Sequence, residues 1–217
     1  MRHRRIIVGA LIVGAGAGML GFAQLGKVKK IGENVVDKVE NAGKEVAAHV
    51  DVPTYGVDSV HSSVIFKIKH GVSNFYGRFT DLKGEWSFDP SDASTARFAF
   101  SIPTKSVETD NARRNNHLKS GDFFNAAQFP EISFQSTSVE ATSGDMYEVK
   151  GDLTMLGKTR KITAQLEWLG TADMQGKTVG AFEAHFTIDR TDYGMDFGVG
   201  MLGKNVDLIV AVEGGKN

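Results

Sequence analysis

Apolar residues recur at every second position over most of this chain. They form eight successive runs, at residues 64–68, 82–88, 96–102, 132–134, 147–155, 162–168, 182–188 and 206–212. Successive side chains of a β-strand point to opposite faces, so each run predicts a strand with one wet and one apolar face. Short turns such as "SGDM" and "MQGK" separate several of the runs. We expect eight or nine antiparallel strands, folded as a closed barrel or a sandwich.

Two segments interrupt the alternation. The second, residues 189–204, is rich in glycine, and the first, residues 104–130, contains "DNARRNNHLKSGDFF". Within the first we expect a short helix capped by Thr109 or Asp110. Spacings of three and four would place Asp110, Arg113, Arg114 and His117 on one face. Its other side would be buried by Leu118, Phe123 and Phe124, folding the segment over the barrel as a lid.

The inward positions leave open whether the barrel is full or hollow. Six of them carry small residues: Gly77, Gly84, Ala96, Gly151, Ala164 and Ala184. Either they leave room for a small ligand, or they mark bulges and bends that curve the sheet. The large inward residues are ordinary core in a full barrel and the lining of a ligand channel in a hollow one. They include Phe66, Ile68, Trp86, Phe98, Phe134, Leu153 and Phe186.

Composition excludes several kinds of chemistry. The formal net charge is −1, which does not indicate a nucleic-acid surface, and cysteine is absent. The chain has no Gly-x-Ser-x-Gly motif, and no two histidines flank a glutamate at helical spacing. We therefore predict no catalytic residue and no metal ligand. His70 continues an inward row at a strand end, where it either bonds a rim carbonyl or reaches a ligand's polar head.

The N-terminus predicts export. "MRHRR" is basic, and residues 6–23 carry no charge, as in a signal peptide. Cleavage after Ala23 would remove three arginines and leave a net charge of 22 − 26 = −4. The alternative is that residues 6–23 remain as an inner-membrane anchor with positive charges on the cytoplasmic side. Either way the barrel lies outside the cytoplasm. Residues 24–53 predict a partly helical spacer, and residues 54–214 the folded domain.

Four phrases, in order, carry a resemblance to a known family. They are "YGVDSVHSSVIFKIKH" (55–70), "DNARRNNHLKSGDFFNAAQFPEISF" (110–134), "GDLTMLGKTRKI" (151–162) and "FTIDRTDYGM" (186–195). Together they resemble the YceI-like family of exported lipid-binding proteins, over about residues 55–214. The resemblance implies an extended lipocalin-like antiparallel β-barrel of about eight strands with a short helical insertion. It also implies an apolar channel for polyisoprenoid chains such as isoprenoid quinones or prenyl phosphates, or for fatty amides.

From the residues and the resemblance together we predict an exported protein that sequesters or carries a long-chain lipid, with no other cofactor. His70, Arg113, Arg114 and His117 are the candidates for contact with a lipid headgroup. The alternative for the arginines and His117 is that they only clasp the insert to the barrel. Two other functions remain open, namely an enzyme that acts on such a lipid and a packed barrel that binds a protein. The sequence predicts neither the particular lipid nor the oligomeric state.

Overall fold

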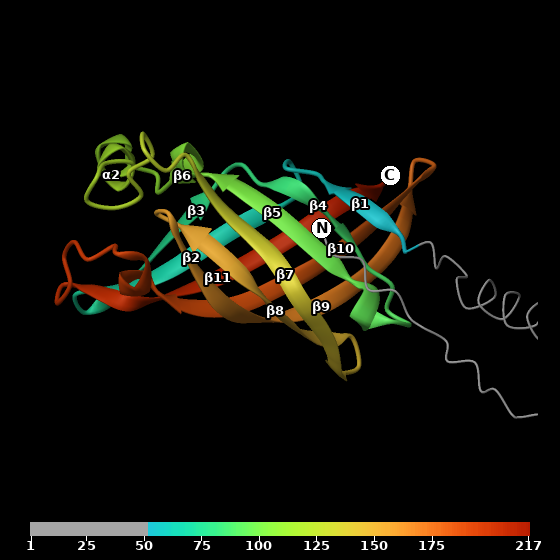
Figure 1. Ribbon diagram of the computed structural model, residues 1–217. Coiled ribbons are helices and arrows are strands. Elements are labelled where there is room, and N and C mark those ends of the chain that lie inside the picture. Colours follow the sequence, from blue (N-terminus) through green and yellow to red (C-terminus); the bar gives the residue numbers. More distant parts are fainter. Residues whose placement is uncertain (1–51) are drawn as a thin grey trace, which may run out of the picture. The chain divides into compact units, whose positions relative to one another are not determined.

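The computed structural model describes residues 52–217 (Figure 1). The predicted signal peptide or anchor (1–23) lies outside the described residues, as does the spacer (24–53) except for its last two residues. Among residues 52–217, no helix combines the length and hydrophobicity that a membrane crossing requires. The strands are β1 (Thr54–Val57), β2 (Ser63–His70), β3 (Ser73–Phe79), β4 (Lys83–Ser87), β5 (Arg97–Pro103), β6 (Val107–Glu108), β7 (Glu131–Ser143), β8 (Met146–Met155), β9 (Lys158–Met174), β10 (Lys177–Asp189) and β11 (Leu202–Lys216).

All these strands belong to one antiparallel sheet that closes on itself. The order β1-β4-β5-β7-β8-β9-β10-β11 returns to β1 through the pairing of Tyr55 with Lys216, which makes a closed eight-stranded barrel. β2 pairs with the same edge of β11 as β1 does, further toward the start of β11, and β3 and β6 follow β2. The prediction of an all-β antiparallel barrel with a helical insertion is therefore confirmed.

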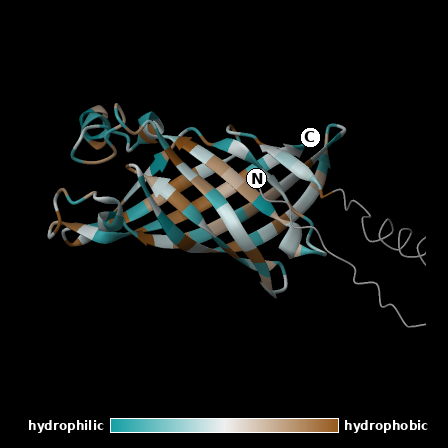
Figure 2. Cartoon of the chain, in the orientation of Figure 1, coloured by the Kyte–Doolittle hydropathy of each residue, from teal (hydrophilic) through white to brown (hydrophobic). Residues whose placement is uncertain are grey.

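The alternation in the sequence determines which face of each strand turns inward. Figure 2 shows hydrophobic and hydrophilic residues alternating along the strands. The hairpins also follow the sequence: Leu156 and Gly157 have positive φ between β8 and β9, as do Gln175 and Gly176 between β9 and β10. Two-residue turns of this kind match the twist of the paired strands.

Three strands were missed because they carry little periodic signal. β1 and β6 are four and two residues long, too short to show alternation. β3 contains Gly77 in the middle of its inward row, which weakens the apolar pattern there. Tertiary pairing with longer neighbours, rather than local propensity, makes these segments strands.

The helical insert and the glycine-rich segment lie at one end of the barrel. The insert contains η2 (Thr104–Ser106), β6 and α2 (Ala112–Leu118), and the glycine-rich segment begins with η3 (Arg190–Tyr193). A further 3₁₀ turn, η1 (Ala93–Thr95), precedes β5. In Figure 1 both α2 and the chain between β10 and β11 project from the end of the barrel opposite to β1 and the C-terminus. We call this end the α2 end.

The interior near β1 is filled with aromatic side chains. We call this cluster the aromatic plug; it consists of Tyr55, Trp86, Phe88, Tyr147 and Trp168. The ring of Trp86 stacks on Tyr55 at 5.2 Å between centroids, and Phe88 lies 4.8 Å from Trp168 and 4.9 Å from Tyr147. A Cβ atom on Gly214 would overlap the ring of Trp86, so the absence of a side chain there makes room for the plug.

Candidate functional site

The other half of the barrel encloses a cavity of about 530 Å³. This volume is in the range of small-molecule binding pockets, roughly 300–1,000 Å³. Phe98, Phe100 and Phe182 line the cavity and also contact the plug, so they form the floor. The barrel is therefore packed at the β1 end and hollow toward the α2 end. The full barrel and the hollow barrel that the sequence left open each describe one half of it.

Most of the large inward residues line this cavity. The structure places Phe66, Ile68, Phe98, Phe134, Leu153 and Phe186 in its wall. Trp86 is not in the wall. It pairs across the strands with Tyr55 and Phe98 at the β1 end, so its indole is part of the plug. The alternation correctly indicated that Trp86 points inward, but it carries no information on where along the barrel axis each residue lies.

The small inward residues have several different roles. A Cβ atom on Gly77 or Gly151 would overlap the ring of Phe66 or Phe134, so these glycines let the two rings lie against the barrel wall. Gly84 has φ +138° and marks a bend where no side chain fits against β5. Ala164 and Ala184 line the cavity, where their small side chains leave the space open. Each of the two readings of the small residues is thus correct at particular positions.

The insert reaches the cavity with its apolar residues. Leu118, Phe123 and Phe124 all contribute to the wall, and the ring of Phe124 meets Phe79 edge-on at 5.4 Å. The cap of α2 differs from the expectation: Asn111 accepts a hydrogen bond from the backbone N–H of Arg114, while Asp110 lies before the helix with φ +57°. An asparagine side chain caps a helix as well as aspartate does.

The two interruptions of the barrel meet above the cavity. The ring of His117 lies 5.0 Å from Phe123 and 5.1 Å from Phe197, and the two phenylalanines lie 5.2 Å apart. His117 Nε2 is also 2.8 Å from Asp122 Oδ2. This aromatic contact joins α2 to the glycine-rich segment, so the two segments together cover the α2 end of the cavity.

A polar clasp ties α2 to the barrel. It consists of Glu108, Thr109, Arg114 and Asn115. Asn115 is buried; its Oδ1 accepts from the Thr109 hydroxyl at 2.6 Å, and its Nδ2 donates to Glu108 Oε1 at 2.7 Å. Arg114 donates to the hydroxyl and the carbonyl oxygen of Thr109. The hydrogen bond from Asn115 is the main cause that lowers the pKa of Glu108, which keeps the carboxylate charged.

The four headgroup candidates do not lie together. His70, Arg114 and His117 line the cavity at the α2 end, whereas Arg113 is exposed and outside the wall. Adjacent residues of a helix point about 100° apart, and of the two arginines only Arg114 contributes to the wall. The guanidinium of Arg114 lies 4.4 Å above the ring of Phe75 and serves the clasp. Within the described residues, no contact supports the expected face shared by Asp110, Arg113 and His117.

Arg190 is a cavity residue that the sequence pattern did not indicate. It lies in η3, is 1% exposed and forms part of the wall. Its Nε donates to the carbonyl oxygen of Gly203 at 2.8 Å and its Nη1 to that of Met195 at 2.6 Å. The available signal was its position in "FTIDRTDYGM", at the boundary between a strand and the glycine-rich segment.

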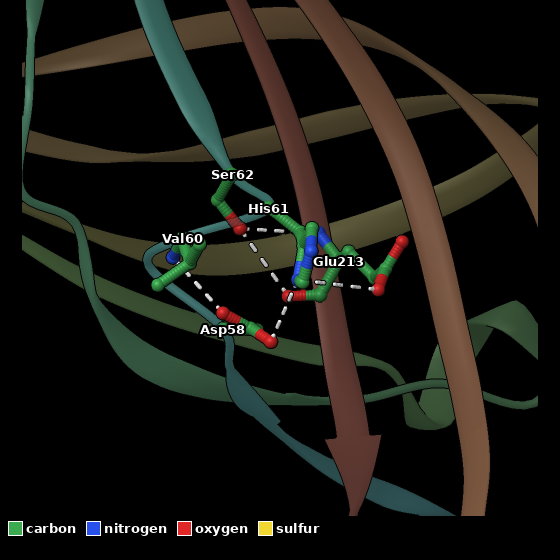
Figure 3. Close-up of polar contacts among 5 residues, drawn as sticks. All are labelled: Asp58, Val60, His61, Ser62 and Glu213. Atoms are coloured by element: carbon green, nitrogen blue, oxygen red, sulfur yellow. Dashed lines mark hydrogen bonds and ion pairs between the residues drawn. The ribbon is translucent and has the colours of Figure 1, made fainter. Parts of the chain in front are cut away.

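A second polar group lies at the opposite end of the barrel (Figure 3). His61 Nδ1 is 3.0 Å from Asp58 Oδ2 and 3.9 Å from Glu213 Oε1, and Ser62 exchanges two hydrogen bonds with the backbone of Glu213. Ligand atoms of Asp58, His61 and Glu213 lie within 4.8 Å of one another, as a metal site would need. All three are partly or fully exposed, and His61 is already bonded, so we assign the group to holding the β1–β2 turn against β11.

This group predicts a pH-dependent contribution to stability. The hydrogen bond to Asp58 and the charges of Asp58 and Glu213 raise the pKa of His61, and the bond from His61 lowers the pKa of Asp58. The contribution of His61 is complete below its usual pKa of about 6.5 and is lost as the pH rises through the raised value. The contribution of Asp58 to stability is complete above the usual aspartate pKa of about 3.9 and is lost as the pH falls below that value.

We therefore expect His61→Gln to lower Tm more at pH 5.5 than at pH 8.5, as measured by circular dichroism. His185→Gln is the control, because His185 is an exposed histidine whose Nε2 contacts Glu183 within a single strand. An equal Tm difference for His61→Gln at both pH values would contradict the assignment.

Comparison with known proteins agrees with this architecture. The YceI-like domain family matches residues 55–214. Protein YceI of Escherichia coli is 38% identical over 177 residues, covering 80% of this chain and 90% of that protein. The crystal structure of Burkholderia cenocepacia BcnA covers 72% of this chain and 98% of its own, with a TM-score of 0.67 and 21% identity. A domain from Saccharophagus degradans described as polyisoprenoid-binding has a TM-score of 0.58 at 15% identity, covering 75% of this chain and 98% of its own. The chain belongs to the YceI-like family.

Proposed function

We propose that this protein binds one long-chain lipid inside its barrel and sequesters or carries it. The apolar cavity of about 530 Å³ carries the proposal. Burial contributes about 0.8 kcal/mol per CH₂ group, so ten methylene groups contribute about 8 kcal/mol before the losses of binding entropy. A gross term of that size makes the hydrocarbon chain the main source of affinity. We propose an isoprenoid of the quinone or prenyl phosphate type, or a similar chain, and the family and the polyisoprenoid-binding neighbour support this choice.

We propose binding without catalysis. The polar residues in the cavity wall are His70, Arg114, His117 and Arg190. Among the described residues, no serine, threonine or carboxylate lines the cavity, so neither histidine there has a side-chain nucleophile to activate. A carrier also needs only a wall that matches the lipid.

The experiment is extraction of the purified protein with organic solvent, followed by mass spectrometry. The protein is taken from its own host, so that its natural lipid is present. We expect a long-chain lipid in near-stoichiometric amount that is recovered unchanged after prolonged incubation with the protein. Conversion of the lipid would indicate an enzyme, and a lipid-free protein that takes up no added isoprenoid would contradict the proposal.

We also propose that the barrel acts outside the cytoplasm, in the periplasm or tethered to the inner membrane. The basic N-terminus followed by the uncharged residues 6–23 supports this location. Residues 1–60 fused to a reporter that is active only in the periplasm are expected to give signal. Signal confined to a reporter active only in the cytoplasm would contradict the location and leave the binding function untouched.

A further inference from the structure

Arg190 carries a positive charge that forms no ion pair with any side chain of residues 52–217. No carboxylate of the described residues lies within ion-pair distance of its guanidinium. The carboxylates of Asp196 and Asp189 are near enough to raise the pKa of Arg190, although burial lowers it more. The Asp189 carboxylate is itself occupied, because it accepts from the backbone N–H and the hydroxyl of Thr191. A guanidinium remains protonated at neutral pH even when burial lowers its pKa.

One nitrogen of this guanidinium also lacks a hydrogen-bond partner. Nη2 is buried and bonds to no atom of the described residues, whereas Nε and Nη1 both donate to backbone carbonyls. Tyr193, in the same 3₁₀ turn, has a buried hydroxyl that likewise bonds to no atom of residues 52–217. Burial raises the pKa of Tyr193 to about 12, so that hydroxyl remains protonated. Buried donors are normally bonded, and an unpaired buried charge is strongly destabilising.

We propose that Arg190 binds the head of the lipid and that this head carries an anionic oxygen, as in a phosphate or a carboxylate. The inference rests on the proposed lipid-binding function and specifies the ligand class for the same cavity. An anionic oxygen would accept a hydrogen bond from Nη2 and would also neutralise the positive charge of the guanidinium. A neutral carbonyl oxygen would only accept the hydrogen bond. Arginine forms its strongest hydrogen bonds with phosphate and carboxylate oxygens.

The other basic groups of the cavity are exposed to solvent. Arg114 already donates through Nε and Nη2 to Thr109, and His117 is bonded to Asp122. His70 is exposed at the end of β2. Arg190 thus differs from the other three in burial, because it is 1% exposed and its unpaired nitrogen is shielded from water, whereas His70, Arg114 and His117 are exposed.

The test compares three ligands that share one hydrocarbon chain: hexadecane, hexadecan-1-ol and hexadecyl phosphate. Binding to the lipid-stripped full chain is measured by native mass spectrometry. We expect hexadecyl phosphate to bind at least tenfold more tightly than hexadecan-1-ol, as for one hydrogen bond to a charged group. Arg190→Gln is expected to reduce this preference to about threefold or less while affinity for the alcohol changes little. Arg113→Gln, which changes an exposed arginine outside the wall, should keep the full preference.

Arg190 also donates hydrogen bonds to the carbonyl oxygens of Gly203 and Met195, so Arg190→Gln changes these two contacts as well. If that variant does not fold, a crystal structure of the wild type with hexadecyl phosphate provides the test. We expect a phosphate oxygen within hydrogen-bond distance of Arg190 Nη2. Three results would overturn the inference: equal affinity of the wild type for the alcohol and the phosphate, a preference that persists in folded Arg190→Gln, or a phosphate bound only by Arg114 or His117. If none of the three ligands binds, the lipid-binding function itself fails; equal binding of all three leaves that function standing and refutes only the role of Arg190.

Discussion

Replacing Trp86 with alanine is expected to lower the free energy of unfolding by about 3–5 kcal/mol, as for other large aromatic residues truncated in a core. Trp86 is 1% exposed, stacks on Tyr55 and meets Phe182 edge-on at 5.4 Å. Its removal would leave a void in the one part of the barrel that is packed solid. Urea denaturation followed by circular dichroism measures the loss.

The size of this loss in unfolding free energy distinguishes a residue of the packed plug from a residue of the cavity wall. A side chain that borders empty space has fewer packing partners to lose, so a wall residue would be less costly to truncate. Tyr76→Ala is the control, because Tyr76 is 58% exposed on β3 and should change stability by no more than about 0.5 kcal/mol. A loss below about 1 kcal/mol for Trp86→Ala would show that the β1 end of the barrel is not a packed plug.

Replacing Ala184 with phenylalanine is expected to reduce lipid binding at least tenfold while the barrel remains folded. Ala184 lies on β10 between Leu166 and Val210, and all three line the cavity. A phenyl ring at this position would occupy the volume that a lipid chain needs. Overpacking destabilises a filled core by about 1–3 kcal/mol, and an open cavity accommodates the added ring with less strain. The bound lipid per protein molecule is measured by mass spectrometry, and folding by circular dichroism.

The control for this substitution is Ala99→Phe. Ala99 lies on β5 with its side chain exposed, so the same added ring stays outside the barrel and lipid content should be unchanged. Gly151 is unsuitable for the purpose, because a side chain there would overlap Phe134 and lie 2.5 Å from the carbonyl oxygen of Gln135. Equal lipid content in Ala184→Phe and the wild type would mean that the chain does not bind in this cavity.

Local patterns predicted the direction of side chains better than their depth. The alternation placed Phe66, Phe98, Phe134 and Phe186 on the inner face, and the structure has all four in the cavity wall. The same alternation placed Trp86 inward but could not distinguish the plug from the wall. The distinction depends on strand register around the closed barrel, which pairs Trp86 with Tyr55, and register is a property of several strands at once.

The insert was foreseen as a helix, but its contacts were not. The spacing put Arg114 and His117 on the face opposite to the apolar residues of the insert. Both instead line the cavity together with those residues, whereas Arg113 is exposed outside the wall. The partner of Arg114 is Thr109 rather than Asp110, because the chain turns at Asp110 before α2 begins. Arg190 was overlooked because charged residues in loops are usually exposed, and its burial depends on how the chain between β10 and β11 folds back on it, with the carbonyl oxygens of Met195 and Gly203 as its partners.

A crystal structure of the protein isolated with its natural lipid tests the central claim most directly. The claim is that a single chain lies in the cavity between the phenylalanine floor and the α2 end. We expect continuous density from the rings of Phe98 and Phe182 to the region of Arg190, surrounded by the apolar wall, with the aromatic plug unchanged. A lipid found only on the outer surface of the barrel, with ordered water or collapsed side chains filling the cavity, would contradict the account.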